Sequence, residues 1–91
     1  MDDWGEELWQ AINELGITPE AHFDQGQPVY VIDWNATHAR HEIYYGKIAR
    51  QSADDDWDVE LPNEQDSFSY PSWTLFRTKK TAQNVFQFLF E

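Results

Sequence analysis

Two histidines and a glutamate stand close together between residues 38 and 42 of this 91-residue chain. Imidazole and carboxylate groups bind zinc, and His38 and His41 lie three positions apart with Glu42 beside them. A zinc site takes three or four protein ligands, however, and Arg40 within the group would repel a cation. We therefore interpret this segment as a solvated loop, and we expect neither a metal site nor a cofactor.

Asp54, Asp56 and Asp58 have the spacing of the first ligands of a calcium-binding loop. The rest of that pattern is missing, because its sixth position requires glycine and is Val59, and its twelfth requires glutamate and is Gln65. We interpret these residues as part of a strand with an acidic face, and weak binding of a divalent cation at residues 54–56 is left open.

No group of residues in the sequence points to catalysis. The serines occur in expected turns or short strands, without the glycine elbow that presents a catalytic serine to its base. The 4 glycines form no phosphate-binding loop, and no acid–base pair can be singled out among the 17 carboxylates. We therefore predict that the chain is not an enzyme, and we assign no catalytic residue.

A row of carboxylates is the most specific feature of the sequence. Asp56, Asp58 and Glu60 alternate with apolar residues, so in a strand they point to one side at intervals of about 6.6–6.8 Å. Asp54 and Asp55 extend this row at its start. Because a nucleic acid strand is also a regular row of negative charges, the row predicts a surface that occupies the basic groove of a nucleic-acid-binding protein. The alternative is an ordinary solvent-facing strand whose charges prevent edge-to-edge pairing.

Two tryptophans are candidates for an exposed anchor in a protein interface. Trp34 stands at the edge of an expected loop, and Trp73 follows shortly after Pro71. An exposed tryptophan with carboxylates around it resembles an interface anchor with an acidic rim. The alternative is a tryptophan packed beneath a loop. Trp57, by contrast, alternates with the acidic residues and is expected in the core.

The composition excludes several kinds of partner and location. A hydrophobic fraction of 41% and an aromatic fraction of 16% predict a folded domain rather than a disordered chain. The net charge of −11 disfavours direct binding to nucleic acid or to an anionic membrane, because both interactions depend on Lys and Arg. The chain has no cysteine, no apolar run long enough to span a bilayer, and an acidic start unlike a secretory signal. These features favour the cytoplasm.

The elements that must position these residues begin with a helix over residues 1–16. Apolar residues recur there at helical spacing, namely Trp4, Leu8, Ile12 and Leu15. Asp3 is the expected N-terminal cap, and Gly16 suits the left-handed conformation that ends many helices. Thr18 and Pro19 could begin one further short turn of helix.

Runs of β-forming residues then predict a small antiparallel sheet. Strands are expected at residues 28–33, 42–50, 56–61 and 67–70, with 73–76 as a candidate fifth. Residues 78–90 fit a helix or a strand, and their length and the cap at Thr78 favour the helix. We therefore predict a single α+β domain over residues 1–91. It consists of the N-terminal helix, a bent sheet or barrel within residues 26–77, and a short helix at 78–90.

Four segments of the sequence resemble the strands of a small SH3-like barrel. They are Gly26–Val31, Tyr45–Ile48, Trp57–Leu61 and Leu75–Lys79. Barrels of this type often begin with a glycine before the first strand and end in a short helix, and the resemblance covers residues 26–90. It implies a fold and little about function, because such barrels host many unrelated activities. In size and charge the chain is similar to acidic proteins of phages and mobile elements that block host nucleases, including anti-restriction and anti-CRISPR proteins.

Together these features predict a non-enzymatic acidic protein that binds the basic surface of another protein. The hypothesis is that it occludes the nucleic-acid-binding surface of a host defence protein, with the carboxylates facing the Lys and Arg residues of that partner. The residues predicted to bind the partner are Asp54, Asp55, Asp56, Asp58, Glu60, Trp34 and Trp73. The alternative is an accessory module that binds a peptide or assembles with itself, its acidity serving only solubility.

Overall fold

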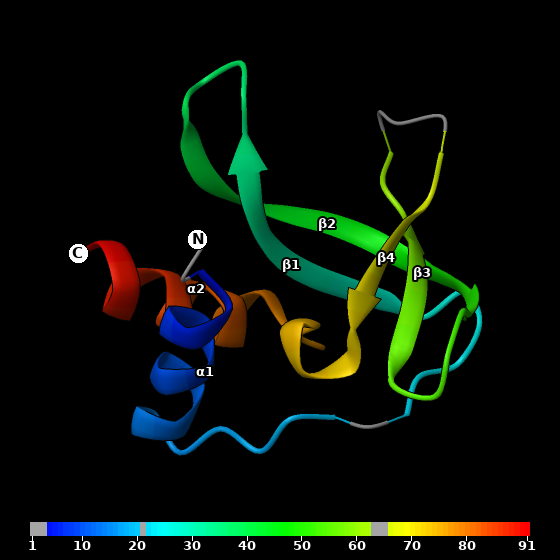
Figure 1. Cartoon of the computed structure of the whole chain (residues 1–91), viewed down its shortest axis with the longest axis horizontal. Coiled ribbons are helices and arrows are strands. Elements are labelled where there is room, and N and C mark those ends of the chain that lie inside the picture. Colours follow the sequence, from blue (N-terminus) through cyan, green and yellow to red (C-terminus); the bar gives the residue numbers. More distant parts are fainter. Residues whose placement is uncertain (1–3, 21, 63–65) are drawn as a thin grey trace.

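The computed structural model describes residues 4–20, 22–62 and 66–91 and shows an α+β protein (Figure 1). An N-terminal helix and a C-terminal helix lie beside a four-stranded antiparallel sheet with the strand order β1-β2-β3-β4, which curls into a half-barrel. The elements are α1 (Trp4–Glu14), β1 (Pro28–Asn35), β2 (Arg40–Gln51), β3 (Asp56–Glu60), β4 (Phe68–Pro71), the 3-10 helix η1 (Ser72–Thr74) and α2 (Lys79–Phe90). No helix in the described ranges is long and apolar enough to cross a membrane.

Helix α1 ends as its sequence predicts. Gly16 adopts a φ of 69°, and the backbone N–H of Ile17 donates to the carbonyl of Ile12 at 3.0 Å. The Gly16 N–H donates to the Asn13 carbonyl at 3.1 Å, which completes the hydrogen-bond pattern of a glycine-terminated helix. The expected cap, Asp3, lies outside the described residues.

Strand β1 contributes to two hydrophobic cores, one on each of its faces. The helix core contains Leu8, Ala11, Ile12, Ile32, Phe76, Ala82 and Val85. The barrel core contains Phe23, Val29, Val31, Ile48, Trp57, Val59 and Leu75. Because successive side chains of a strand point to opposite faces, Ile32 packs against the helices while Val29 and Val31 fill the concave side of the sheet. The prediction that Trp57 is a core residue is confirmed, since only 4% of it is exposed.

Gly46 allows the middle of β2 to approach β3 closely. A Cβ atom at this position would lie 2.6 Å from Val59 Cγ1 and 2.9 Å from the Glu60 carbonyl oxygen. Any side chain would therefore push the two strands apart. The structure therefore shows close packing of the two strands at this glycine. A shift of register does occur in β2, but it lies between Ile48 and Arg50.

The C-terminal part of the chain confirms one prediction and corrects another. Helix α2 forms as expected, and the Thr78 hydroxyl accepts a hydrogen bond from the Thr81 N–H at 3.2 Å. The candidate fifth strand at 73–76 is wrong, because η1 occupies its start and only Phe76 pairs, in a single bridge with Tyr30. The expected helical turn at Thr18 is also absent; the described residues there have no regular structure.

Candidate protein-binding site

Three successive carboxylates of the predicted site lie in the turn between β2 and β3 and at the first residue of β3. We call residues 54–56 the acidic turn. Asp54 and Asp55 are exposed and Asp56 is half-buried. Among the described residues, none of their three carboxylates makes a hydrogen bond or an ion pair. The acidic turn therefore presents three negative charges that no neighbouring group in the described structure neutralises.

The backbone of the acidic turn is held in place on both sides. The Ser52 N–H donates to the Asp56 carbonyl at 2.9 Å, and the Ser72 N–H donates to the Asp55 carbonyl at 2.6 Å. The Gln51 side-chain amide donates to the Asp54 carbonyl at 2.8 Å. All three carbonyls of the turn are thus engaged, which leaves the carboxylates on a fixed backbone.

Asp58 does not belong to the exposed row, and the expectation of an evenly spaced ladder is wrong at this residue. Its side chain is 12% exposed, and its Oδ2 forms an ion pair with Arg50 Nε at 2.9 Å. The register shift explains this contact, because without it Ala49, and not Arg50, would stand opposite Asp58. The charge of Asp58 is therefore balanced within the protein.

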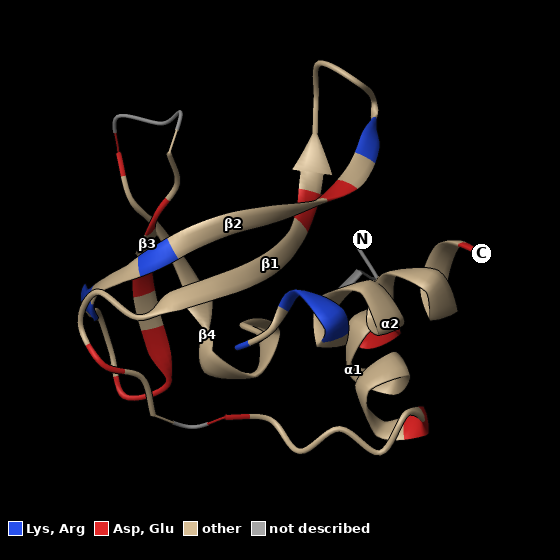
Figure 2. Cartoon of the chain, turned by 180° about the vertical axis from the view of Figure 1, so that it is seen from behind, with Lys and Arg blue, Asp and Glu red and all other residues tan. Residues whose placement is uncertain are grey.

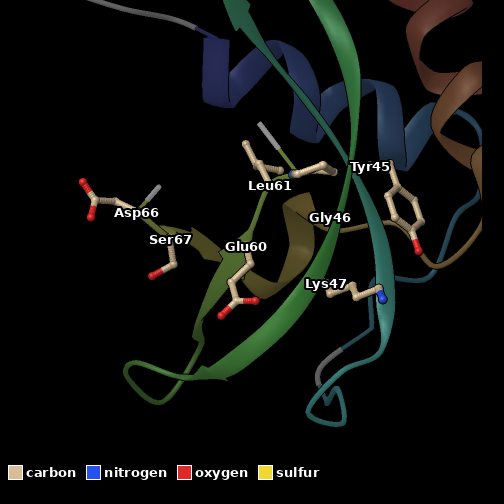
Figure 3. A pocket seen from close by; sticks show the side chains of 8 residues that line it. Tyr45, Gly46, Lys47, Glu60, Leu61, Asp66 and Ser67 are labelled. Carbon is tan, nitrogen blue, oxygen red and sulfur yellow. The ribbon is translucent and has the colours of Figure 1, made fainter. Parts of the chain in front are cut away.

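Glu60 is exposed but lies at the far end of β3 from the acidic turn. Lys47 stands opposite it in the register, yet the two side chains point in different directions (Figure 3). Glu60 and Asp66 border an open groove of about 820 Å³ between β2 and the end of β3. Figure 2 shows the basic segments of β2 beside the acidic segments of β3. The predicted row is thus divided into the acidic turn, a neutralised Asp58 and a separate Glu60.

Trp73 lies beside the acidic turn. It belongs to η1, whose first residue, Ser72, is bonded to the backbone of Asp55. The Trp73 indole is half-buried and meets the ring of Trp9 edge-to-face, with 5.4 Å between the ring centroids. Trp9 is 45% exposed. The structure therefore places the backbone of η1 beside the acidic turn, while the Trp73 ring packs against the helix core and against Trp9 of α1.

Trp34 is 53% exposed, but the strand pairing places it beside His41 and not beside the acidic turn. His41 lies near the start of β2, whereas the acidic turn follows Gln51 at the other end of that strand. Of the two tryptophans predicted as anchors, only Trp73 lies next to the carboxylates.

Two residues that the structure connects to η1 and to β3, Trp9 and Asp24, were not among the predicted site residues. Trp9 stands beside Leu8 on the flank of the apolar stripe of α1, a position that could have indicated exposure. Asp24 is brought near β3 because Phe23 contacts the Trp57 ring, with centroids 5.6 Å apart. No local pattern could have indicated this contact.

The two histidines of the hairpin between β1 and β2 have different partners. His38 Nδ1 lies 2.7 Å from Glu42 Oε1, while the His41 ring stacks on Phe90 with centroids 5.2 Å apart. Glu42 also accepts hydrogen bonds from Arg40 Nε and from the Asn35 amide, each at 3.0 Å. These contacts, the one to His38 foremost, lower the pKa of Glu42 to about 2. The described ranges contain no group of three side chains suited to hold a metal ion.

The acidic turn, Trp73 and Trp9 form the candidate site, which combines fixed and unpaired carboxylates with a partly exposed aromatic pair. Such an arrangement suits contact with a positively charged surface, because the aromatic rings supply apolar area and the carboxylates supply complementary charge. No protein-family model, curated protein or solved structure matches this chain.

Proposed function

We propose that this protein is a non-enzymatic binding module that places the acidic turn against a basic surface of another protein. The fixed backbone of the acidic turn and its carboxylates, which have no partner in residues 4–20, 22–62 and 66–91, carry the proposal. A partner's Lys or Arg can approach them without first breaking an internal ion pair and without ordering a loop. Binding of this kind associates rapidly at low ionic strength and weakens as salt screens the charges.

The aromatic pair gives the proposed interface its apolar centre. Trp9 is 45% exposed and is supported from behind by Trp73. Tryptophan is enriched among the few residues that carry most of the binding energy in protein interfaces. In this proposal the indole of Trp9 inserts between apolar groups of the partner, and the carboxylates form the charged rim.

The partner class that best fits a net charge of −11 is a protein whose basic surface binds nucleic acid, such as a host defence protein met by a phage or mobile element in the cytoplasm. The protein would occlude that surface and compete with the nucleic acid. Because Asp58 is neutralised by Arg50, the competition depends on the acidic turn, with Asp24 and Glu60 as outlying charges. It does not depend on a regular ladder of charges.

A capture experiment with two matched charge variants tests the proposal. The immobilised protein is incubated with nuclease-treated lysate at low salt, and bound proteins are eluted with increasing salt. The first variant replaces Asp54, Asp55 and Asp56 with Asn. The control variant, Glu14→Gln, Asp66→Asn and Glu91→Gln, removes the same charge from exposed positions elsewhere.

We expect a basic protein to bind the wild type and the control variant and to be lost from the first variant. Duplex DNA should then displace the captured protein. Equal capture by all three proteins, or equal loss from both variants, would contradict the proposal, because binding would then not depend on the acidic turn.

Self-assembly is the alternative that the sequence left open. The β4 edge of the sheet argues against one route to it, which is strand pairing between two copies of the protein. Strand β4 is short and ends at Pro71, which has no N–H and whose carbonyl accepts a hydrogen bond from Thr74 Oγ1 at 2.8 Å. Edge-to-edge pairing through β4 would therefore be weak. Sedimentation equilibrium across a range of concentrations measures any self-association directly.

A further inference from the structure

A second cavity opens at the mouth of the half-barrel, on the concave side of the sheet. It has a volume of about 160 Å³. Its lining residues are Asp33, Trp34, Tyr44, Leu61, Phe68 and Tyr70. Phe68 and Tyr70 pair with Val59 and Trp57, which are core residues of the concave face, so both rings face the same side. Phe68 is nevertheless 42% exposed, which places an accessible aromatic ring at the cavity.

The carboxylate of Asp33 lies in this cavity with neutral hydrogen-bond donors. Its Oδ2 accepts from the Tyr70 hydroxyl at 2.8 Å, and its Oδ1 accepts from the Trp34 N–H at 2.7 Å. In the part of the chain that the structure describes, Asp33 makes no ion pair. Glu42 stands directly opposite Asp33 in the register, but it is already bound by Arg40. Asp33 is thus a negative charge that is held in position without a cation of its own.

We propose that this cavity binds a guanidinium group, supplied by an arginine side chain of a partner protein. Each oxygen of Asp33 has a second lone pair, so the carboxylate can accept a further pair of hydrogen bonds. The rings of Tyr44, Phe68 and Tyr70 provide faces over which a cation is attracted. A guanidinium is planar and more weakly hydrated than the lysine ammonium, so it loses less solvation in an aromatic site. The cavity has room for one such head group.

This site is separate from the acidic turn and can be tested without a partner. Failure of the cavity to bind arginine would leave the proposed contact of the acidic turn untouched, and failure of the capture experiment would leave the cavity untouched. The two proposals share only the expectation that the partner is basic.

The test is an NMR titration with N-acetyl-arginine amide, using N-acetyl-lysine amide and N-acetyl-citrulline amide as comparison ligands. The backbone amide of Trp34 is the reporter, because it donates directly to Asp33. We expect a saturable shift with the arginine ligand, about tenfold weaker binding of the lysine ligand and no saturable shift with neutral citrulline. Equal binding of lysine, or no saturable shift with arginine, would overturn the proposal.

Variants at the cavity locate the binding. Asp33→Asn should abolish the arginine-dependent shift, and Phe68→Ala should weaken it. Glu14→Gln changes the net charge equally at an exposed position of α1 and should bind arginine as the wild type does. If Asp33→Asn does not fold, Phe68→Ala decides the question, because Phe68 is 42% exposed and lies outside the buried core. Unchanged arginine binding by folded Asp33→Asn or by folded Phe68→Ala contradicts the proposal.

Discussion

The acidic turn and Glu42 lie at opposite ends of β2 and differ in whether their carboxylates have partners within the described structure. Glu42 has three hydrogen-bond partners, from His38, Arg40 and Asn35, and its pKa falls to about 2. The carboxylates of the acidic turn have no partner among the described residues. Both regions carry carboxylates, but only the acidic turn leaves its charge available to another molecule. The donors around each carboxylate therefore decide whether its charge can bind a partner.

Strand β2 connects the two regions, and its central glycine is where a single substitution has the largest expected effect. Gly46→Ala places a methyl group against Val59 and the Glu60 backbone, which cannot move away as a flexible side chain could. We expect the free energy of unfolding to fall by about 1–3 kcal/mol. Urea denaturation measures it. Unchanged stability would mean that β2 and β3 are not in close contact at this point.

The pairing of Asp58 with Arg50 can be separated from general charge effects by a matched substitution. Arg50→Met leaves the largely buried carboxylate of Asp58 without its partner, and we expect the free energy of unfolding to fall by about 1–2 kcal/mol. The effect is smaller than for a fully buried ion pair, because the guanidinium of Arg50 is largely exposed to solvent. Lys47→Met, the control, also removes one positive charge from β2, at the position opposite Glu60. It should change the free energy of unfolding by no more than about 0.5 kcal/mol. Equal effects in urea denaturation would show that Asp58 is not specifically paired.

The hydrogen bonds of Glu42 predict a stability that depends on pH. Its pKa is lowered from 4.5 to about 2 in the folded protein, so the unfolded chain takes up the proton first as the pH falls. The stabilisation is complete above pH 4.5 and is lost as the pH falls towards 2. The difference in urea midpoint between the wild type and Glu42→Gln should therefore shrink across this window. A constant difference from pH 6 to pH 2 would refute this role of Glu42.

The acidic turn should show the smallest effect on stability. Replacing Asp54, Asp55 and Asp56 with Asn removes mutual repulsion and breaks no internal contact of their carboxylates. We expect the free energy of unfolding to stay the same or to rise by about 0.5 kcal/mol at low salt, and we expect its salt dependence to fall. A loss of about 1 kcal/mol or more would show that these side chains support the fold, and the contrast with Glu42 would disappear.

Much of the fold follows from local patterns in the sequence. The spacing of Leu8 and Ile12, the glycine at position 16 and the cap at Thr78 predict both helices because each depends on residues within a few positions. The strands follow from short runs of β-forming residues in the same way. The candidate fifth strand failed because η1 and the bridge from Phe76 to Tyr30 depend on a contact distant in the sequence.

The sequence by itself determined that the chain is acidic, folded as α+β and rich in carboxylates around residues 54–60. Only the tertiary structure decided which of these charges are available. A one-residue shift in β2 places Arg50 against Asp58, and the bond from Ser72 to Asp55 places Trp73, and not Trp34, beside the acidic turn. Register and long-range pairing bring residues together that no local pattern connects, which is why the alternating pattern predicted a strand correctly and a regular charged surface wrongly.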